Sequence, residues 1–170
     1  MKKRYYVLVS VTILCLCIAF VCRIFTPTHE PFEHTMTGYL VTQDGAGQPC
    51  EVRVAGTRNT YPTFSTDCNS IRFVDSGGIF LNGTRLAIDH FVFPHKTDQY
   101  AICSFPGVGT FLLSLNGDCI IGILENDYDD TLFLAPASTK EEALILISHL
   151  ESLIQGTSSS KFFQRVRSYF

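Results

Sequence analysis

Tryptophan is absent from this chain of 170 residues, and so are the short motifs that identify most enzyme classes. There is no Gly-x-Ser-x-Gly elbow, no His-Glu-x-x-His pair and no glycine-rich phosphate loop. No two cysteines have the Cys-x-x-Cys spacing that redox sites and many zinc sites use. The sequence therefore indicates no particular reaction. We predict no cofactor, and no motif identifies a catalytic residue.

Positive charge is scarce over most of the chain. Four of the thirteen Lys and Arg residues lie at or before Arg23. The chain beyond Arg23 therefore has nine Lys and Arg residues and all sixteen Asp and Glu residues, and its formal charge is −7. A domain that binds nucleic acid needs a basic surface to meet the phosphate backbone. This acidity excludes nucleic acid as a partner.

One long stretch near the start has no charge at all. It runs from Tyr5 to Cys22, eighteen residues, with Lys2-Lys3-Arg4 before it and Arg23 after it. About twenty apolar residues cross a hydrocarbon core of roughly 30 Å, and basic flanks extend a slightly shorter run. We therefore predict a transmembrane anchor over residues 5–23, with the lipid bilayer as its partner.

The alternative to an anchor is a signal that is cleaved or lipidated. A secretory signal ends in small residues at its cleavage site, whereas Ala19-Phe20-Val21-Cys22 includes bulky Phe and Val. The same residues fit a lipoprotein signal poorly, because a small residue should precede the modified cysteine. The sequence favours an uncleaved anchor and leaves the other two outcomes open.

The distribution of basic residues predicts the orientation. Three of them precede the apolar run and one follows it, and cytoplasmic ends carry the excess of Lys and Arg. We expect a single-pass protein of the cell membrane in which residues 1–4 are cytoplasmic and the main domain is extracytoplasmic.

Beyond the anchor the sequence predicts one domain. Residues 24–35 contain two prolines and mixed polarity, and we interpret them as a stalk. Residues 36–156 are enough for one compact domain, and residues 157–170 follow the small-residue linker "GTSSS" as a flexible basic and aromatic tail.

The domain is predicted to be mainly β with one C-terminal helix, an α+β class. Short apolar runs alternate with turns, and Asn82-Gly83 and Asn116-Gly117 favour the tight turns of β-hairpins. Seven to nine strands would form an antiparallel meander or a partly closed barrel, capped by the helix.

The helix is predicted from its cap and its periodicity. Ser138 can cap it, with Glu141 completing a capping box, and Gly156 ends it. The apolar stripe has helical spacing and consists of Ala143, Leu146, Ile147, Leu150, Leu153 and Ile154.

Two resemblances follow from these segments. "TGYLV" and "TLFLAPASTKEEALILISHLESL" resemble the first strand and the last strand-plus-helix of pleckstrin-homology-like domains. The matching first loop, "QDGAGQP", has no Lys or Arg, so phosphoinositide binding is not implied. The whole layout, with "VRVAGTRNTYPTF" leading to "GIFLNG", resembles small single-pass membrane-anchored proteins of unknown function from Gram-positive bacteria. That resemblance implies a location and supplies no site residues.

Four cysteines follow the anchor. An even number in an oxidising compartment permits two disulfides, and Cys50–Cys68 with Cys103–Cys119 closes the shortest loops. The alternative is that all four are buried free thiols, each of which behaves as a small apolar residue of the core.

Two acidic or histidine-containing segments have ligand chemistry. The loop 125–130 offers carboxylates for calcium from Glu125, Asp127, Asp129 and Asp130, although it has no EF-hand spacing and an ordinary turn explains it. "HEPFEH", residues 29–34, combines imidazole and carboxylate, but Pro31 prevents the helix that would place His29 beside His34.

Asp89 and His90 are a neighbouring acid and imidazole, and a further histidine, His95, lies close behind them. Neighbouring residues on a strand point to opposite faces, so Asp89 is badly placed to orient His90. We predict no catalytic dyad from this pair, although it remains the best candidate if the domain is an enzyme.

The tail mixes basic and aromatic residues. Such a segment suits a membrane surface or an acidic partner, and the expected contact residues are Lys161, Phe162, Phe163, Arg165 and Arg167. The alternative is that the tail packs against its own acidic domain.

The functional hypothesis is a membrane-anchored extracytoplasmic binding or scaffold module of the cell envelope, with an envelope protein as a further partner. One alternative is a hydrolase-like envelope enzyme that uses Asp89 and His90 or the acidic loop. Another is an accessory subunit of a membrane protein complex.

Overall fold

The computed structural model describes the chain except for residues 1, 63–64, 96, 126–129 and 155–156. On residues 2–5, 23–25 and 157–158 it describes the backbone and not the side chains. Two residues of the predicted acidic site, Asp127 and Asp129, lie outside the described residues.

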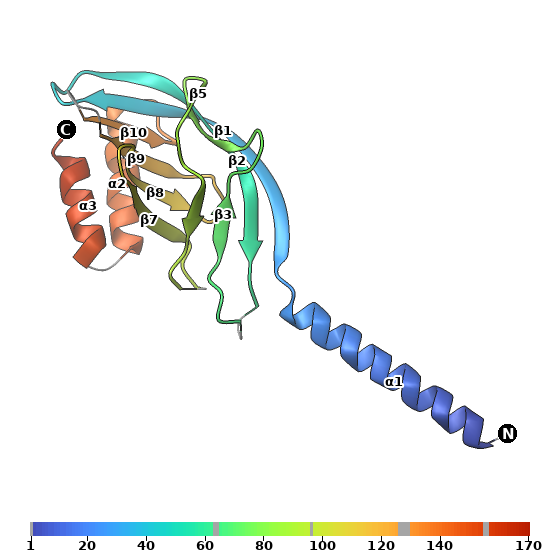
Figure 1. The fold of residues 1–170 in the computed structure, drawn as a ribbon. Coiled ribbons are helices and arrows are strands. Elements are labelled where there is room, and N and C mark those ends of the chain that lie inside the picture. The colour runs from blue at the N-terminus through green and yellow to red at the C-terminus, as the bar shows by residue number, and fades with distance from the viewer. Residues whose placement is uncertain (1, 63–64, 96, 126–129, 155–156) are drawn as a thin grey trace.

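The described residues form a mainly β domain between an N-terminal helix and two C-terminal helices (Figure 1). The helix α1 covers Lys2–Phe25. The strands are β1 (Thr28–Thr42), β2 (Gly47–Thr60), β3 (Ser70–Arg72), β4 (Gly78–Leu81), β5 (Thr84–Arg85), β6 (His90–Val92), β7 (Tyr100–Phe105), β8 (Gly109–Ser114), β9 (Ile120–Leu124) and β10 (Thr131–Ala135). The chain ends with α2 (Lys140–Leu153) and α3 (Thr157–Arg167). The predicted α+β class, mainly β, is confirmed, with one helix more than expected at the C-terminus.

The first two strands form a long hairpin, and this corrects the predicted stalk. β1 pairs with β2 in antiparallel register from Thr28 opposite Thr60 to Val41 opposite Gly47. The segment 28–35 is therefore half of a strand, and its polar composition reflects an exposed two-stranded ribbon. Arg53 pairs with Glu33 at 2.7 Å across this ribbon.

Pro31 is compatible with β1 because of the edge it faces. β10 pairs with β1 from Tyr39 onward. On the same side of β1, the Thr37 carbonyl accepts a hydrogen bond from the Ala137 amide. Backbone groups of alternate residues point to the same edge, so the Pro31 nitrogen also faces this side, beyond the end of β10. A proline there removes no ladder hydrogen bond.

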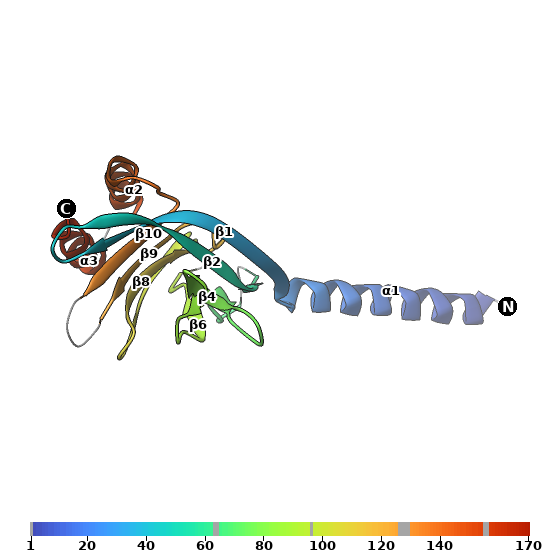
Figure 2. The ribbon, with the colours of Figure 1, turned by 90° about the horizontal axis from the view of Figure 1, so that it is seen from above.

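The sheet curls into a partly closed barrel. Its strand order is β5-β4-β2-β1-β10-β9-β8-β7, and β3 pairs with both β2 and β6. Figure 2 shows β4 and β6 on one side of β8, β9 and β10, with α2 and α3 on the other. In the described chain β6 and β7 approach each other without strand pairing, and we call this gap the seam.

Aromatic rings fill the inside of the barrel. A continuous series of ring contacts, with centroids 5.3–6.2 Å apart, runs through Phe73, Phe91, Phe105, Phe111 and Phe133. Phe91, Phe111 and Phe133 have no exposed surface. Buried apolar side chains of this size each stabilise a fold by about 1.5–3 kcal/mol.

The C-terminal helices α2 and α3 cover the outer face of β8, β9 and β10. Ala143, Ile147 and Leu150 of α2 and Phe163 and Val166 of α3 are buried against it. The expected stripe of α2 is therefore correct at its centre, whereas Leu153 is 54% exposed. The cap lies one residue later than predicted.

That cap has Thr139 in the place predicted for Ser138. The Thr139 hydroxyl accepts a hydrogen bond from the Glu142 amide at 3.2 Å. The Glu142 carboxylate in turn accepts hydrogen bonds from the hydroxyl and the amide of Ser138, both at 2.7 Å. These hydrogen bonds lower the pKa of Glu142, because they favour the ionised form.

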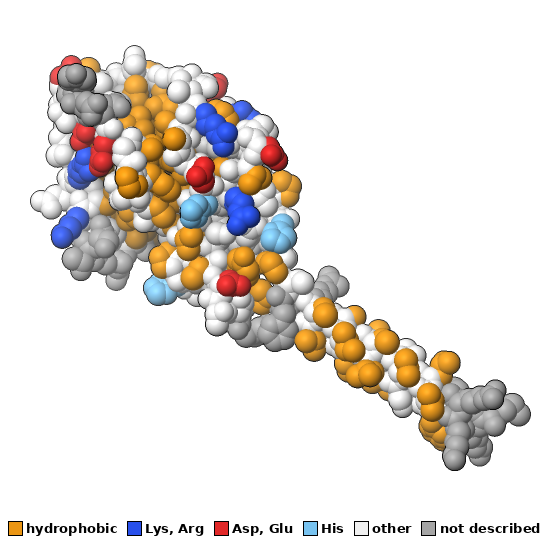
Figure 3. All heavy atoms as spheres, viewed as in Figure 1, with side chains coloured by type: hydrophobic (Ala, Val, Ile, Leu, Met, Phe, Trp, Pro, Cys, Tyr) orange, Lys and Arg blue, Asp and Glu red, His pale blue; other side chains and the backbone are white. Residues whose placement is uncertain are grey.

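The helix α1 projects away from the domain (Figures 1 and 2). Its apolar side chains are exposed along its length, Leu8 by 69% and Phe20 by 67% (Figure 3). Among the residues that the structure describes, none of the helices combines the length and the hydropathy needed to cross a membrane.

Candidate functional site on the outer face of β3 and β6

The outer face of β3 and β6 carries polar side chains, because the inner face holds the core. Ile71 and Phe91 point inward and are fully buried, and they lie opposite each other in the register. The alternate residues point outward, so that Arg72 lies opposite His90 and Ser70 lies opposite Val92.

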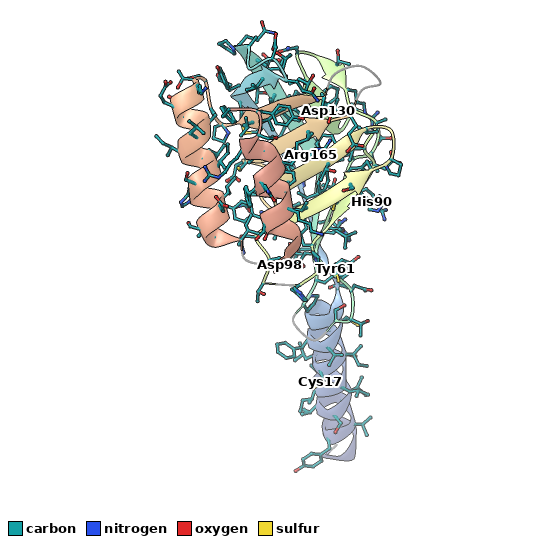
Figure 4. All side chains as sticks on the ribbon, turned by 90° about the vertical axis from the view of Figure 1, so that its left-hand side faces the viewer. Cys17, Tyr61, His90, Asp98, Asp130 and Arg165 are labelled. Atoms are coloured by element: carbon teal, nitrogen blue, oxygen red, sulfur yellow. The ribbon has the colours of Figure 1, made fainter. Side chains whose placement is uncertain are left out.

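These outward side chains line a groove of about 570 Å³. Its polar lining consists of Tyr61, Asp67, Cys68, Ser70, Arg72, Asp89 and His90. Two apolar residues, Val74 and Val92, add exposed surface and are 48% and 42% exposed. Figure 4 places Tyr61 at the end of the domain nearest α1, with His90 farther along.

A buried amide network holds one wall of the groove. Asn69, 2% exposed, accepts a hydrogen bond from the Tyr61 amide at 3.0 Å. Asn59 donates to the Ser70 hydroxyl at 3.3 Å, and its carbonyl oxygen meets the His29 ring. Sequence reasoning missed these two asparagines, since nothing local distinguishes them from ordinary turn residues.

The structure brings Asp89 and His90 to the same groove but assembles no dyad in its described residues. Both side chains are exposed, and the Asp89 backbone carbonyl accepts a hydrogen bond from the Phe73 amide at 2.9 Å. No hydrogen bond joins the Asp89 carboxylate to the His90 ring in the described chain. Within the same residues, no three His, Cys, Asp or Glu side chains converge as metal ligands would.

The four cysteines of the domain are free thiols in the structure, and their positions argue against the preferred pairing. Cys103 packs against the core inside the barrel, whereas Cys119 belongs to the core under the helices. A disulfide needs Cβ atoms about 3.8 Å apart, which the two faces of one sheet do not provide. Cys50 is buried inside the barrel, and Cys68 lines the groove outside it.

Burial raises the pKa of three of these thiols. The pKa of Cys50 rises to about 11 and that of Cys119 to about 12, with the Asp118 carboxylate adding to the effect of burial at Cys119. Burial also raises the pKa of Cys103, although its contact with the Val92 carbonyl acts in the opposite direction. Such thiols are protonated at neutral pH and are poor nucleophiles.

The described acidic residues of the loop 125–130 form ion pairs with another residue of the domain. Arg165 donates to the Glu125 carboxylate at 3.0 Å and to the Asp130 carboxylate at 2.7 Å (Figure 4). The hydrogen bond that Arg165 donates to Asp130 is the main reason that the pKa of Arg165 is raised. Glu125 and Asp130 thus neutralise a cation of the chain itself.

The tail corrects a second prediction, because it is a docked helix. Phe162 and Phe163 are 6% and 0% exposed, so neither is available to a membrane surface. Arg167 pairs with Glu151 of α2 at 2.7 Å. The Phe170 carbonyl accepts a hydrogen bond from the Lys140 side chain at 3.1 Å. Of the expected contact residues, Lys161 and Arg167 are exposed.

Packing of the tail on its own acidic domain, the alternative that the sequence left open, is what the structure has. The spacing of Phe162, Phe163, Val166 and Tyr169 fits one face of a helix and could have revealed this.

No family model, no curated protein and no solved structure matches the chain. Its function is therefore argued from the surface of the domain alone. The groove can hold a ligand by hydrogen bonds and ion pairs, and its described residues contain no aligned acid, base and nucleophile.

Proposed function

We propose that this chain is a membrane-anchored binding module that holds its β domain outside the cytoplasm and catalyses no reaction. The observation that carries the binding role is the filled interior of the barrel. Phe91, Phe111 and Phe133 are fully buried inside it among other apolar side chains, so that recognition of a ligand has to use the outer surface. The groove on β3 and β6 is one such surface.

The anchor is supported by where the exposed apolar side chains lie. Of the fourteen large apolar residues that are exposed in the described chain, ten are on α1, between Tyr6 and Val21. A soluble protein rarely exposes such a continuous apolar surface to water. The basic residues before the run favour a cytoplasmic N-terminus.

The enzyme alternative has a weaker basis. It requires an acid to orient His90, and in the described residues no carboxylate does so. The accessory-subunit alternative differs from a binding module only in the permanence of the complex, so the same surfaces would serve it.

The anchor is tested by fractionating cells that express the full chain. The wild-type protein should stay in the membrane after alkaline carbonate extraction. Ile13→Asp places a charge near the middle of the run, at a cost of about 2.5–3.5 kcal/mol, and should release the protein. Ile13→Val keeps the residue apolar and should change nothing. Release of the wild-type protein by carbonate would refute the anchor.

The orientation is tested with a thiol at Ser76, which is exposed in the turn between β3 and β4. The Ser76→Cys variant should react with a membrane-impermeant maleimide in intact cells. Labelling only after lysis would place the domain in the cytoplasm and remove the envelope function.

A further inference from the structure

Arg72, on the outer face of β3, differs from the other arginines whose side chains the structure describes. Within the described residues its guanidinium forms no hydrogen bond and no ion pair. The others each donate to an oxygen of the chain, and they are Arg53, Arg58, Arg85, Arg165 and Arg167. A guanidinium has five donors in a planar fork, which matches the two oxygens of a carboxylate. Arg72 is therefore available to a ligand.

His90 of β6 is the neighbour of Arg72 across the strand pair. The Phe73 amide donates to the Asp89 carbonyl at 2.9 Å, so these two residues form a hydrogen-bonded pair. The next pair, Arg72 with His90, is then a non-hydrogen-bonded one. Side chains of such a pair lie closest to each other, with Cβ atoms about 4.5–5.5 Å apart. The guanidinium and the imidazole therefore stand side by side on the outer face.

Asp89 brings a negative charge to the same groove. It immediately precedes β6, and no ion pair joins its carboxylate to Arg72 or to another described residue. On the face that Figure 3 shows, basic, acidic and histidine side chains lie close together over β3. Arginines elsewhere pair with carboxylates directly, as Arg53 does with Glu33 at 2.7 Å. The groove thus keeps one positive and one negative charge unpaired.

Apolar surface lies beside these charges. Four large apolar residues outside α1 are exposed in the part of the chain that the structure describes, and two of them, Val74 and Val92, line the groove. Sites for small molecules have volumes of about 300–1,000 Å³ and combine apolar walls with a few polar groups that fix orientation. The groove, at about 570 Å³, has this size and this composition.

Ser70 supplies a further donor in a fixed place. Its hydroxyl oxygen accepts a hydrogen bond from the Asn59 side chain at 3.3 Å, which leaves the O–H group to donate. Asn59 is only 7% exposed, and its own oxygen meets the His29 ring. The buried amide network therefore holds Ser70 at the floor of the groove, between the charged residues and Tyr61.

We propose that this groove binds an α-amino acid with an apolar side chain, in its zwitterionic form. Arg72 binds the carboxylate, with His90 beside it, and Asp89 binds the ammonium group. The side chain of the ligand covers the two exposed valines. A zwitterion has no net charge, so the formal charge of −7 beyond Arg23 does not repel it as it repels an anion. This inference rests on the proposed binding function and names its class of ligand.

The register of the strands favours a ligand with both charges on one carbon atom. Asp89 is opposite Phe73, so it is one residue away from Arg72 in the pairing of β3 and β6. A ligand with a carboxylate alone brings a second negative charge close to Asp89. A ligand with an amine alone leaves Arg72 unpaired. In a peptide the two terminal charges are at opposite ends, and in an α-amino acid they are neighbours.

The test uses the full chain in detergent micelles with L-leucine as the probe. Nuclear magnetic resonance follows the backbone amides during a titration, and the saturation of their shifts gives the Kd. The amides of Ser70, Arg72, His90 and Val92 should shift, whereas that of Ile145, on the exposed face of α2, should not.

Three analogues of leucine each lack one of the proposed contacts. Leucinamide has no carboxylate, 4-methylpentanoate has no amino group, and glycine has no apolar side chain. Each should bind at least about fivefold more weakly than leucine, since a hydrogen bond to a charged group or a buried apolar group is lost. Equal binding of leucine and 4-methylpentanoate would reveal a plain carboxylate site, and equal binding of leucinamide a plain cation site. Either result would overturn the inference.

Two protein variants assign the two charges of the ligand. Arg72→Gln should abolish the preference for leucine over leucinamide, and Asp89→Asn should abolish the preference over 4-methylpentanoate. Arg167→Gln and Glu141→Gln make the same changes at exposed residues of α3 and α2 and should keep both preferences. All four residues are exposed, and an unchanged amide spectrum outside the mutated site shows that each variant folds.

The remaining outcomes separate this inference from the proposed function. Absence of saturable shifts at the groove would overturn the inference, and so would shifts that Arg72→Gln and Asp89→Asn leave unchanged. The membrane anchor and the orientation are measured separately, by carbonate extraction and by maleimide labelling. Those two results would stand if leucine failed to bind.

Discussion

The rings of Phe91 and Phe105 meet across the seam of the barrel, with centroids 5.3 Å apart and planes inclined by 59°. They belong to strands that share no backbone pairing. The closure of the barrel is therefore an apolar contact, and its strength depends on these side chains.

Truncating Phe91 should open the seam. Phe91 is fully buried, so Phe91→Ala is expected to lower the free energy of unfolding by about 3–5 kcal/mol, the cost of a large cavity. Val92→Ala, at a neighbouring residue that is 42% exposed, should change it by less than about 0.5 kcal/mol. Chemical denaturation of both variants measures the difference, and equal effects would show that the rings do not hold the barrel.

Two glycine turns provide a second prediction. Gly83 and Gly117 both have positive φ, 79° and 76°. A Cβ at Gly83 would meet open space, whereas one at Gly117 would overlap the ring of Phe32. Gly83→Ala should cost only the backbone strain, about 1 kcal/mol. Gly117→Ala should cost clearly more, because the β8–β9 turn packs on β1.

Thermal unfolding of the two glycine variants checks this contact. If both variants lose the same stability, the Phe32 ring does not rest on the turn. The ribbon of β1 and β2 would then be free of the barrel at that point.

The docking of α3 is the subject of the third prediction. Phe163 is fully buried, whereas the Arg165 and Glu125 side chains are 41% and 44% exposed. Phe163→Ala should therefore destabilise the domain by about 3–5 kcal/mol. Arg165→Gln removes solvent-screened ion pairs and should cost about 1 kcal/mol or less, with a smaller effect at high salt. Hydrogen exchange of α3 distinguishes a detached helix from a global loss, and a larger effect for Arg165 would make the charges the main contact.

Local rules predicted some of these features and not others. Asn82-Gly83 forms the expected tight turn, with both residues at positive φ. At Asn116-Gly117 only the glycine has positive φ, yet the hairpin forms at the predicted place. Turns and caps depend on a few neighbouring residues, so short motifs are enough to locate them.

The predictions of a stalk and of a flexible tail were wrong, because the structure of both segments depends on residues that are far away in the sequence. Residues 28–35 show no apolar alternation, and their strand exists because β2 pairs with them. The groove is also non-local, since Tyr61, Arg72 and His90 meet only when β3 pairs with β6. In the tail the helical spacing of the aromatic residues was visible, but the sequence did not show which surface they would cover.

The buried thiols give the last prediction, which concerns alkaline pH. Burial raises the pKa of Cys119 to about 12 in the folded state, while the unfolded thiol titrates near 8.5–9. Between these values the unfolded chain binds fewer protons than the folded one, so stability should fall as pH rises, by up to about 1.4 kcal/mol per pH unit for one thiol. Cys119→Ala should flatten this dependence above about pH 9. Denaturation curves from pH 8 upward measure this slope in the wild type and in the Cys119→Ala variant. The range starts about half a unit below the pKa of a free thiol. Equal slopes in the wild type and the Cys119→Ala variant would mean that this thiol is not buried, or that it is held in a disulfide.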